Sequence, residues 1–188
     1  MRLSAVLLVF CSLLAAGEFP IGSRLAAVTV TGPGAPPAIQ TSAAKATAVV
    51  FVSVQCPVSN AYNGRLASLY NDYVPQGVQF AFVNANATES PSEVEAHEKR
   101  VGWPFQVVKD NGNTLADKLG AEHTPEAFVF DQAGTLVYHG RVDDSMNESG
   151  VKQRDLRAAL DAVLAGRPVP VAETRAFGCS IKRAKQTP

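Results

Sequence analysis

The sequence contains very few cysteines, and none of them forms a local dithiol pair. Only three occur among the 188 residues, at positions 11, 56 and 179. The third residue after Cys56 is Ser59, where a CxxC redox motif would place its second cysteine. If Cys56 works as a redox thiol, its partner must therefore come from far away in the chain or from another molecule.

A surplus of positive charge is absent as well. Lysine and arginine together number 17, as do aspartate and glutamate, and no basic stripe or arm stands out. Nucleic-acid binding relies on clustered basic side chains, so the sequence argues against nucleic acid as a partner. With 46% hydrophobic and 18% charged residues, the composition is that of one ordinary globular domain.

Long apolar runs are also missing, apart from one at the N-terminus. Arg2 precedes the apolar stretch LSAVLLVFCSLLAA, and small residues follow up to Gly17. This is the pattern of a secretory signal peptide, so we predict a signal at residues 1–17. The run is short for a bilayer span, although a retained N-terminal anchor is the alternative. We expect an exported protein, periplasmic or extracellular, without a stable membrane span.

The remainder of the chain divides into three parts. Residues 18–45 are rich in Gly, Pro, Ala, Ser and Thr and are interpreted as a linker, with room for one short strand at AAVTV. Residues 46–166 carry regular apolar patterns and form the predicted domain. Residues 167–188 are a polar tail without periodicity, and this tail carries Cys179.

Within residues 46–166, buried strands alternate with amphipathic helices. The runs TAVVFVSV and VQFAFVNAN predict strands covered on both faces. Helices are predicted near residues 62–73, 91–101, 113–120 and 153–166, the second opened by a capping box between Ser90 and Glu93. The segment EAFVFDQAGTLVYHGRV predicts a hairpin. The expected fold class is α/β, with a central mixed sheet, a C-terminal antiparallel hairpin and helices on both faces.

Cys56 lies where the first buried strand ends and a helix begins. Unpaired backbone N–H groups at a helix start favour the thiolate form of a cysteine. Pro57 suits the first helical turn because it has no N–H to leave unpaired. Ser59 can hydrogen-bond a thiolate but cannot resolve a mixed disulfide. The alternative is a buried, inert cysteine.

Three features, CPVSN after a strand, HTPEAFVFD before a hairpin and the closing amphipathic helix, resemble the thioredoxin fold. Within it they are similar to exported redoxins related to alkyl hydroperoxide reductase and thiol-specific antioxidant, here with a monothiol CPVS motif. FGCSIKR in the tail is similar to the closing motif of one such subgroup. The resemblance implies a cis peptide bond at Thr124–Pro125 facing Cys56, with the Thr124 backbone available to bind a substrate peptide.

The chain departs from the peroxidase branch of that family. Ser53 can fill the position of the upstream threonine, but Val49 stands where a proline is usual. Pro125 and Glu126 lie where that branch has an arginine, which counts against peroxide activation.

Cys179 is the candidate resolving thiol. A tail thiolate can attack a sulfenic acid or a mixed disulfide on Cys56, and the neighbouring Lys182 and Arg183 favour that thiolate. A free Cys179, or one bonded to another chain, remains open because sequence does not determine connectivity.

Three histidines complete the candidate residues. His123 precedes the Thr124–Pro125 turn and is the one expected near Cys56, where it could tune the thiol or ligate a metal. The alternative is a partly exposed turn residue. His97 and His139 are expected at the surface.

Four functions follow from these residues. The first is an exported thiol–disulfide oxidoreductase with Cys56 as nucleophile, acting on protein dithiols or disulfides with an unidentified electron donor. The second is a peroxiredoxin-like thiol peroxidase acting on hydroperoxides. The third is a copper-handling protein, which would need Cys56, Cys179 and His123 together. The fourth is a non-enzymatic binding module. No cofactor and no metal site are predicted.

Overall fold

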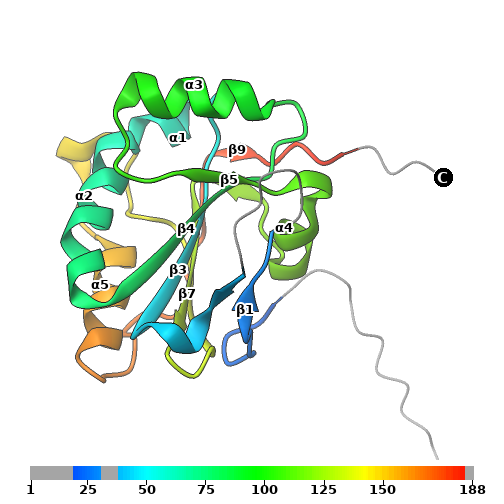
Figure 1. Ribbon diagram of the computed structural model, residues 1–188. Coiled ribbons are helices and arrows are strands. Elements are labelled where there is room, and N and C mark those ends of the chain that lie inside the picture. The colour runs from blue at the N-terminus through cyan, green and yellow to red at the C-terminus, as the bar shows by residue number, and fades with distance from the viewer. Residues whose placement is uncertain (1–18, 31–37, 185–188) are drawn as a thin grey trace, which may run out of the picture.

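The structure is a computed structural model that describes residues 19–30 and 38–184 (Figure 1). The signal peptide predicted at residues 1–17 lies outside the described residues. The helices are α1 (Pro57–Ala61), α2 (Asn63–Tyr73), α3 (Pro91–Val101), α4 (Thr114–Leu119) and α5 (Asp155–Leu164). The strands are β1 (Ala27–Val28), β2 (Ile39–Gln40), β3 (Ala46–Phe51), β4 (Val78–Asn84), β5 (Val107–Lys109), β6 (His123–Thr124), β7 (Glu126–Asp131), β8 (Leu136–Gly140) and β9 (Cys179–Ser180).

The two predicted apolar runs form the centre of a five-stranded sheet with the order β5-β4-β3-β7-β8. Strand β3 pairs in parallel with β4 and antiparallel with β7, so Ala46 lies opposite both Val78 and Asp131. All six residues of β3 are buried, which explains why its sequence is apolar at every position except Thr47 rather than alternating. Strand β8 joins β7 as the predicted antiparallel hairpin.

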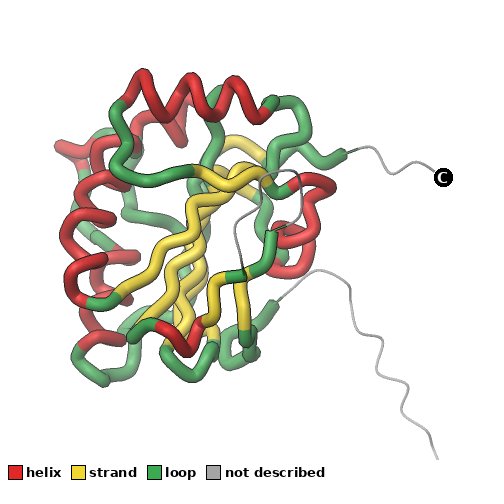
Figure 2. The backbone as a smooth tube through the Cα atoms, in the orientation of Figure 1, coloured by secondary structure: helices red, strands yellow, loops and turns green. Residues whose placement is uncertain are grey.

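Helices cover both faces of this sheet, as predicted (Figure 2). Alternate residues of β3 point to opposite faces. Ala48 and Val50 pack into a cluster with α2 and α5, whereas Val49 and Phe51 pack into a second cluster with α4. The capping box at Ser90 and Glu93 is also confirmed at the start of α3.

The segment interpreted as a linker, residues 18–45, is instead part of the folded domain where the structure describes it. Strand β1 pairs with β2 and lies within the predicted AAVTV strand. The side chains of Leu25, Val28 and Val30 are buried in the α4-side cluster. The Leu25 backbone N–H donates to the carbonyl oxygen of Gly134 at 2.8 Å, which fixes the segment to the β7–β8 turn. Glycine and proline content indicated a loop, but isolated apolar residues suffice to dock it on a hydrophobic face.

The polar tail is likewise not a free extension. Strand β9 pairs antiparallel with β6, with Thr124 opposite Cys179 and His123 opposite Ser180. Ile181 is buried in the α4-side cluster. The boundary predicted at residue 166 therefore marks the end of helix α5 but not the end of the folded domain.

Within residues 19–30 and 38–184, no helix is both long enough and apolar enough to cross a lipid bilayer.

Candidate active site

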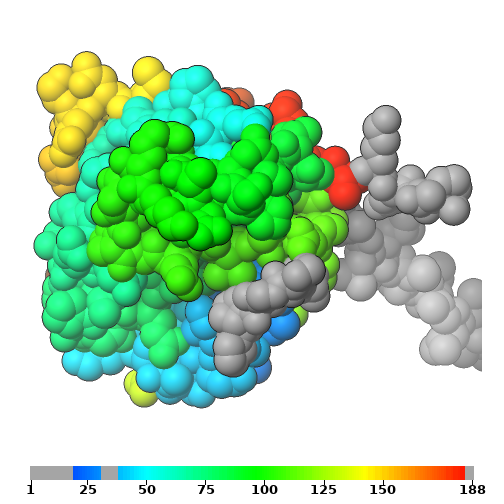
Figure 3. Space-filling view, turned by 45° about the horizontal axis from the view of Figure 1, so that its top comes forward, coloured from blue at the N-terminus to red at the C-terminus, as the bar shows by residue number. Residues whose placement is uncertain are grey.

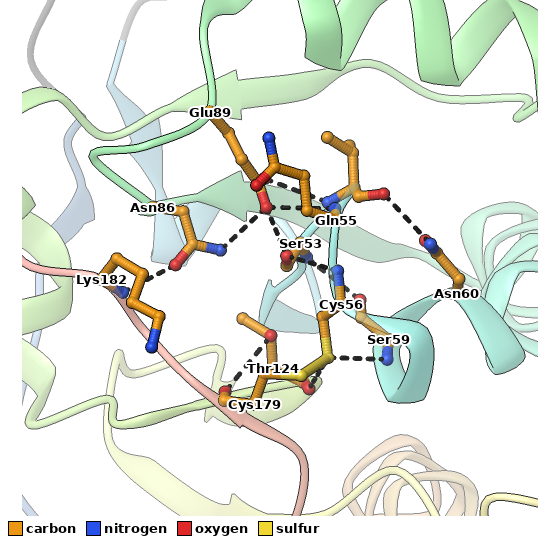
Figure 4. The surroundings of a disulfide bond; sticks show 11 residues. Ser53, Gln55, Cys56, Ser59, Asn60, Asn86, Glu89, Thr124, Cys179 and Lys182 are labelled. Atoms are coloured by element: carbon orange, nitrogen blue, oxygen red, sulfur yellow. Dashed lines mark hydrogen bonds between the residues drawn. A yellow bond between two sulfur atoms is a disulfide. The ribbon is translucent and has the colours of Figure 1, made fainter.

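Cys56 occupies the N-cap position of α1, directly after the loop that follows β3 (Figure 4). Its Sγ accepts a hydrogen bond from the backbone N–H of Ser59 at 3.3 Å. Pro57 is the first helical residue, where the missing N–H removes no helical hydrogen bond. The residue is only 3% exposed, so the strand-to-helix turn buries the sulfur almost completely in this oxidised state.

Cys56 forms a disulfide with Cys179, 123 residues further along the chain. Their Cα atoms are 5.9 Å apart, within the range that a disulfide spans without backbone movement. Cys179 is more exposed than Cys56. The sequence left this pairing open, and the fold brings the two residues together because β9 lies beside β6.

The Thr124–Pro125 peptide bond is cis, as the resemblance implied. The carbonyl oxygen of Thr124 lies 3.5 Å from Cys56 Sγ, so the turn faces the sulfur. The Thr124 hydroxyl donates to the carbonyl oxygen of Cys179 at 3.4 Å. The backbone edge expected to bind a substrate peptide is thus occupied by the protein's own tail.

The two serines support the cysteine loop rather than the sulfur itself. Ser53 Oγ accepts from the backbone N–H of Cys56 at 3.0 Å. Ser59 Oγ accepts from the backbone N–H of Ser53, also at 3.0 Å. Ser59 contacts the sulfur through its backbone N–H, so this contact does not depend on the serine hydroxyl.

Glu89 is the central residue that the sequence analysis missed. Its carboxylate is 2% exposed and accepts hydrogen bonds from the backbone N–H groups of Val54 at 3.0 Å and Gln55 at 3.1 Å. Ser53 Oγ donates to it at 2.5 Å. One buried carboxylate therefore holds the three residues that precede Cys56 (Figure 4).

Further polar side chains connect Glu89 to β4, β5 and the tail. The amides of Asn84 and Asn86 donate to its carboxylate. Lys109 donates to Asn84 Oδ1 at 2.6 Å, and burial lowers the pKa of this lysine. The backbone N–H of Lys182 donates to Asn86 Oδ1 at 2.7 Å. The loop before Cys56 and the chain after Cys179 are thus linked through Glu89 and Asn86.

One signal could have located this network. Strands β3 and β4 are parallel neighbours, so their carboxyl ends meet at one edge of the sheet. Polar residues that directly follow two such strands are candidates for a site at that edge. Ser53 and Asn86 each lie two residues beyond these strands and Asn84 is the last residue of β4, but a loop of Asn, Ala and Thr also has ordinary turn composition.

The histidines are placed differently from one another. His123 lies in β6 opposite Ser180, and its backbone N–H donates to Glu126 Oε2 at 2.7 Å. His139 is partly exposed and bonds Glu126 Oε1 at 2.6 Å, so it braces the same turn. The expectation that His97 is at the surface was wrong, since it is 2% exposed.

A hollow of about 240 Å³ lies beside the disulfide. Its lining comes from the cysteine loop, the Glu89 loop and the tail: Ser53, Gln55, Cys56, Asn86, Thr88, Glu89, Cys179, Ser180 and Lys182. Lys182 is the cation among these lining residues, and no described arginine is among them. In the described part of the chain, no three Cys, His, Asp or Glu side chains converge as metal ligands.

The fold is thioredoxin-like. It combines this sheet order with a cis proline that faces a cysteine at the strand-to-helix turn. Other solved thioredoxin-like structures share this fold. Residues 29–139 match the model of the AhpC/TSA family. The protein belongs to this family.

Two solved structures are similar over nearly the whole chain. An uncharacterized conserved protein from Geobacillus kaustophilus is 31% identical with a TM-score of 0.79, covering 90% of this chain and 95% of its own. A hypothetical protein from Sinorhizobium meliloti 1021 is 32% identical with a TM-score of 0.78, covering 89% and 97%. The similarity includes the segments expected to be linker and tail, because the coverage exceeds the predicted domain.

A curated relative is similar over a shorter stretch. Thiol-disulfide oxidoreductase ResA from Halalkalibacterium halodurans is 30% identical over 87 residues, which is 46% of this chain. The match spans about half of the relative's length, 48%.

Proposed function

We propose that this protein is an exported thiol–disulfide oxidoreductase in which Cys56 is the nucleophile and Cys179 the resolving thiol. The observation that carries the proposal is the disulfide between them, formed at a strand-to-helix turn and facing a cis proline. Membership of the AhpC/TSA family and the activity named for the Halalkalibacterium relative support it.

In the reduced protein, the Cys56 thiolate attacks one sulfur of a substrate disulfide. A mixed disulfide forms and one substrate thiolate leaves. The Cys179 thiolate then attacks Cys56 Sγ, which closes the Cys56–Cys179 disulfide and releases the second substrate thiolate. Two electrons pass from the protein to the substrate, and an external dithiol returns them.

The surrounding residues take supporting roles. The backbone N–H of Ser59, 3.3 Å from the sulfur, stabilises the Cys56 thiolate. Pro57 fixes the first turn of α1, and Ser53 holds the Cys56 backbone. Thr124, which precedes the cis Pro125, pairs with Cys179 and so holds the resolving cysteine beside Cys56. His123 is the candidate for tuning the thiol, because β6 places it next to Thr124.

The proposal is tested with the reduced protein and its two cysteine variants. Wild type should exchange with a disulfide substrate and end as the Cys56–Cys179 disulfide in mass spectra. Cys179→Ser should stop at a mixed disulfide on Cys56, and Cys56→Ser should not react. If Cys56→Ser exchanges as fast as wild type, the proposed function is wrong.

A thiol peroxidase is the second candidate, favoured by the family match. Cys56 thiolate would attack a peroxide oxygen to give a sulfenic acid and hydroxide or an alkoxide. Cys179 would then condense with the sulfenic acid to form the disulfide and release water. Stopped-flow mixing with hydrogen peroxide separates the candidates: fast sulfenic acid formation favours the peroxidase, and no reaction favours disulfide exchange.

The copper-handling alternative is tested by titrating the reduced protein with copper(I). Stoichiometric binding that needs Cys56, Cys179 and His123 together would favour it over exchange. A non-enzymatic module would show neither copper(I) binding nor thiol reactivity.

Export rests on the signal pattern in residues 1–17. Mass spectrometry of the protein recovered from a periplasmic or culture fraction should identify Glu18 as its first residue. If the protein is found only in a membrane fraction and still carries residues 1–17, a retained anchor is favoured.

A further inference from the structure

The tail after Cys179 is held by contacts that do not depend on the disulfide. The Ile181 N–H donates to the Glu122 carbonyl at 2.8 Å, and the Ala87 N–H donates to the Lys182 carbonyl at 2.8 Å. The Ile181 residue is only 6% exposed. Hydrogen bonds from Lys182 to Asn86 and from Ala184 to Asn113 Oδ1 at 2.8 Å extend the attachment.

The tail before Cys179 is attached as well. The His139 N–H donates to the Ala172 carbonyl at 2.9 Å, and the Thr174 N–H donates back to the His139 carbonyl at 3.0 Å. The ring of Phe177 packs edge-on against Tyr62, with centroids 6.4 Å apart. Reducing the disulfide breaks none of these contacts, so Cys179 should remain beside Cys56 in the dithiol state.

This attachment closes the peptide-binding edge of β6. An extended protein segment binds a sheet edge through its backbone, and the backbone of Thr124 and His123 already pairs with β9. A protein substrate docking there would have to displace anchored residues on both sides of Cys179. In Figure 3 the end of the described tail lies against the surface of the domain.

A hollow beside the disulfide offers an approach to the sulfurs that leaves the tail in place. Its volume of about 240 Å³ lies below the usual range of about 300–1,000 Å³ for drug-sized ligands. The side chains of Gln55, Thr88 and Ser180 line it together with both cysteines. It has room for a small molecule, and a whole protein domain is too large to enter it.

We infer that the substrate of Cys56 is a low-molecular-mass disulfide that enters this hollow while the tail stays docked. The inference rests on the proposed function. Cys56 attacks one sulfur of the small disulfide RSSR, and RS⁻ leaves through the hollow. Cys179, already in place, attacks Cys56 Sγ and expels the second RS⁻, so two protein thiolates yield one disulfide and two small thiolates.

The experiment compares two oxidants of the reduced full chain. Bis(2-hydroxyethyl) disulfide is the small probe and insulin the protein probe, and each rate is divided by that probe's rate with free dithiothreitol. The normalised rate should be at least about tenfold higher for the small probe. Equal normalised rates would overturn the inference and leave the proposed function standing, whereas no reaction with either probe would overturn both.

A pair of tail variants tests the cause of that difference. Ile181→Ser removes a buried anchor and should raise the insulin rate while changing the small-probe rate by less than about twofold. Val171→Ser is the matched control, because Val171 is 54% exposed and anchors nothing in the core, and it should change neither rate. An insulin rate unmoved in a folded Ile181→Ser protein would contradict the role of the tail.

Amide hydrogen exchange tests the docked tail without any substitution. The N–H groups of Ile181, Lys182 and Ala184 should keep their protection within about tenfold when the disulfide is reduced. Loss of that protection on reduction would show that the disulfide alone holds the tail, and the inference would be wrong.

Discussion

The two cysteines of the site are positioned in opposite ways. Cys56 follows strand β3 and begins helix α1, so its position depends on neighbouring residues in the sequence. Cys179 lies in a two-residue strand whose partners, His123 and Thr124, are more than 50 residues earlier. The disulfide pair is therefore assembled by the fold, and only Cys56 lies in a recognisable local motif.

Glu89 links the segments that carry the two cysteines. It binds the loop before Cys56 directly and reaches the tail through Asn86 and the backbone of Lys182. Variants and pH can separate the Cys56 segment, which is built by local sequence, from the Cys179 segment, which is held by distant contacts.

The largest effect is expected from removing the disulfide. It closes a loop of 123 residues, so Cys179→Ser should lower the free energy of unfolding by about 2–5 kcal/mol in urea denaturation. Reduced wild type should match the variant. Equal stability of the reduced and oxidised wild type would contradict this prediction, since the disulfide would then add no constraint to the unfolded chain.

Glu89→Ala should have the next largest effect. It leaves the buried N–H of Val54 and the part-buried N–H of Gln55 without their acceptor, which should cost about 3 kcal/mol. Glu93→Ala, at the exposed capping box, is the control and should cost less. Equal losses in urea denaturation would contradict the central role of Glu89.

Gly178→Ala should act on the tail alone. Gly178 has φ +149°, and an added Cβ would overlap the Thr124 carbonyl oxygen. We expect a loss of about 1–2 kcal/mol and weaker amide protection at Ile181. Gly166→Ala is the matched control, because its φ is also positive at +64° but a Cβ there meets open space. Similar loss of tail protection in both variants would argue against this contact.

The smallest effect on stability is expected from pH, through His97 in α3. Burial, together with the nearby Arg100, lowers the pKa of His97, whose Nε2 lies 3.2 Å from the amide of Asn63 at the start of α2. Because the unfolded chain binds the proton more readily, stability should fall as pH drops below about 6.5. Urea midpoints at pH 7.5 and 5.5 should differ less in His97→Gln. If the urea midpoints of wild type and His97→Gln change equally with pH, His97 is not the cause of the pH dependence.

Much of the local structure could be predicted from the sequence. The continuous apolar runs of β3 and β4, the capping box of α3 and the β7–β8 hairpin all follow from nearest-neighbour preferences. The burial of His97 was not predicted because most side chains of α3 are polar, although Val94 and Val101 lie on the same helix face as His97. It is buried by Trp103 and Asn63, which approach from other segments.

The sequence alone determined that Cys56 follows a buried strand and opens a helix, since backbone propensity and proline geometry act over a few residues. The resemblance to the thioredoxin fold, rather than local propensity, pointed to Thr124–Pro125 as the facing turn. Tertiary structure alone decided that Cys179 is the partner, that Glu89 holds the cysteine loop and that the tail fills the β6 edge. Those outcomes depend on which distant segments pack together, and short-range patterns carry no information about that.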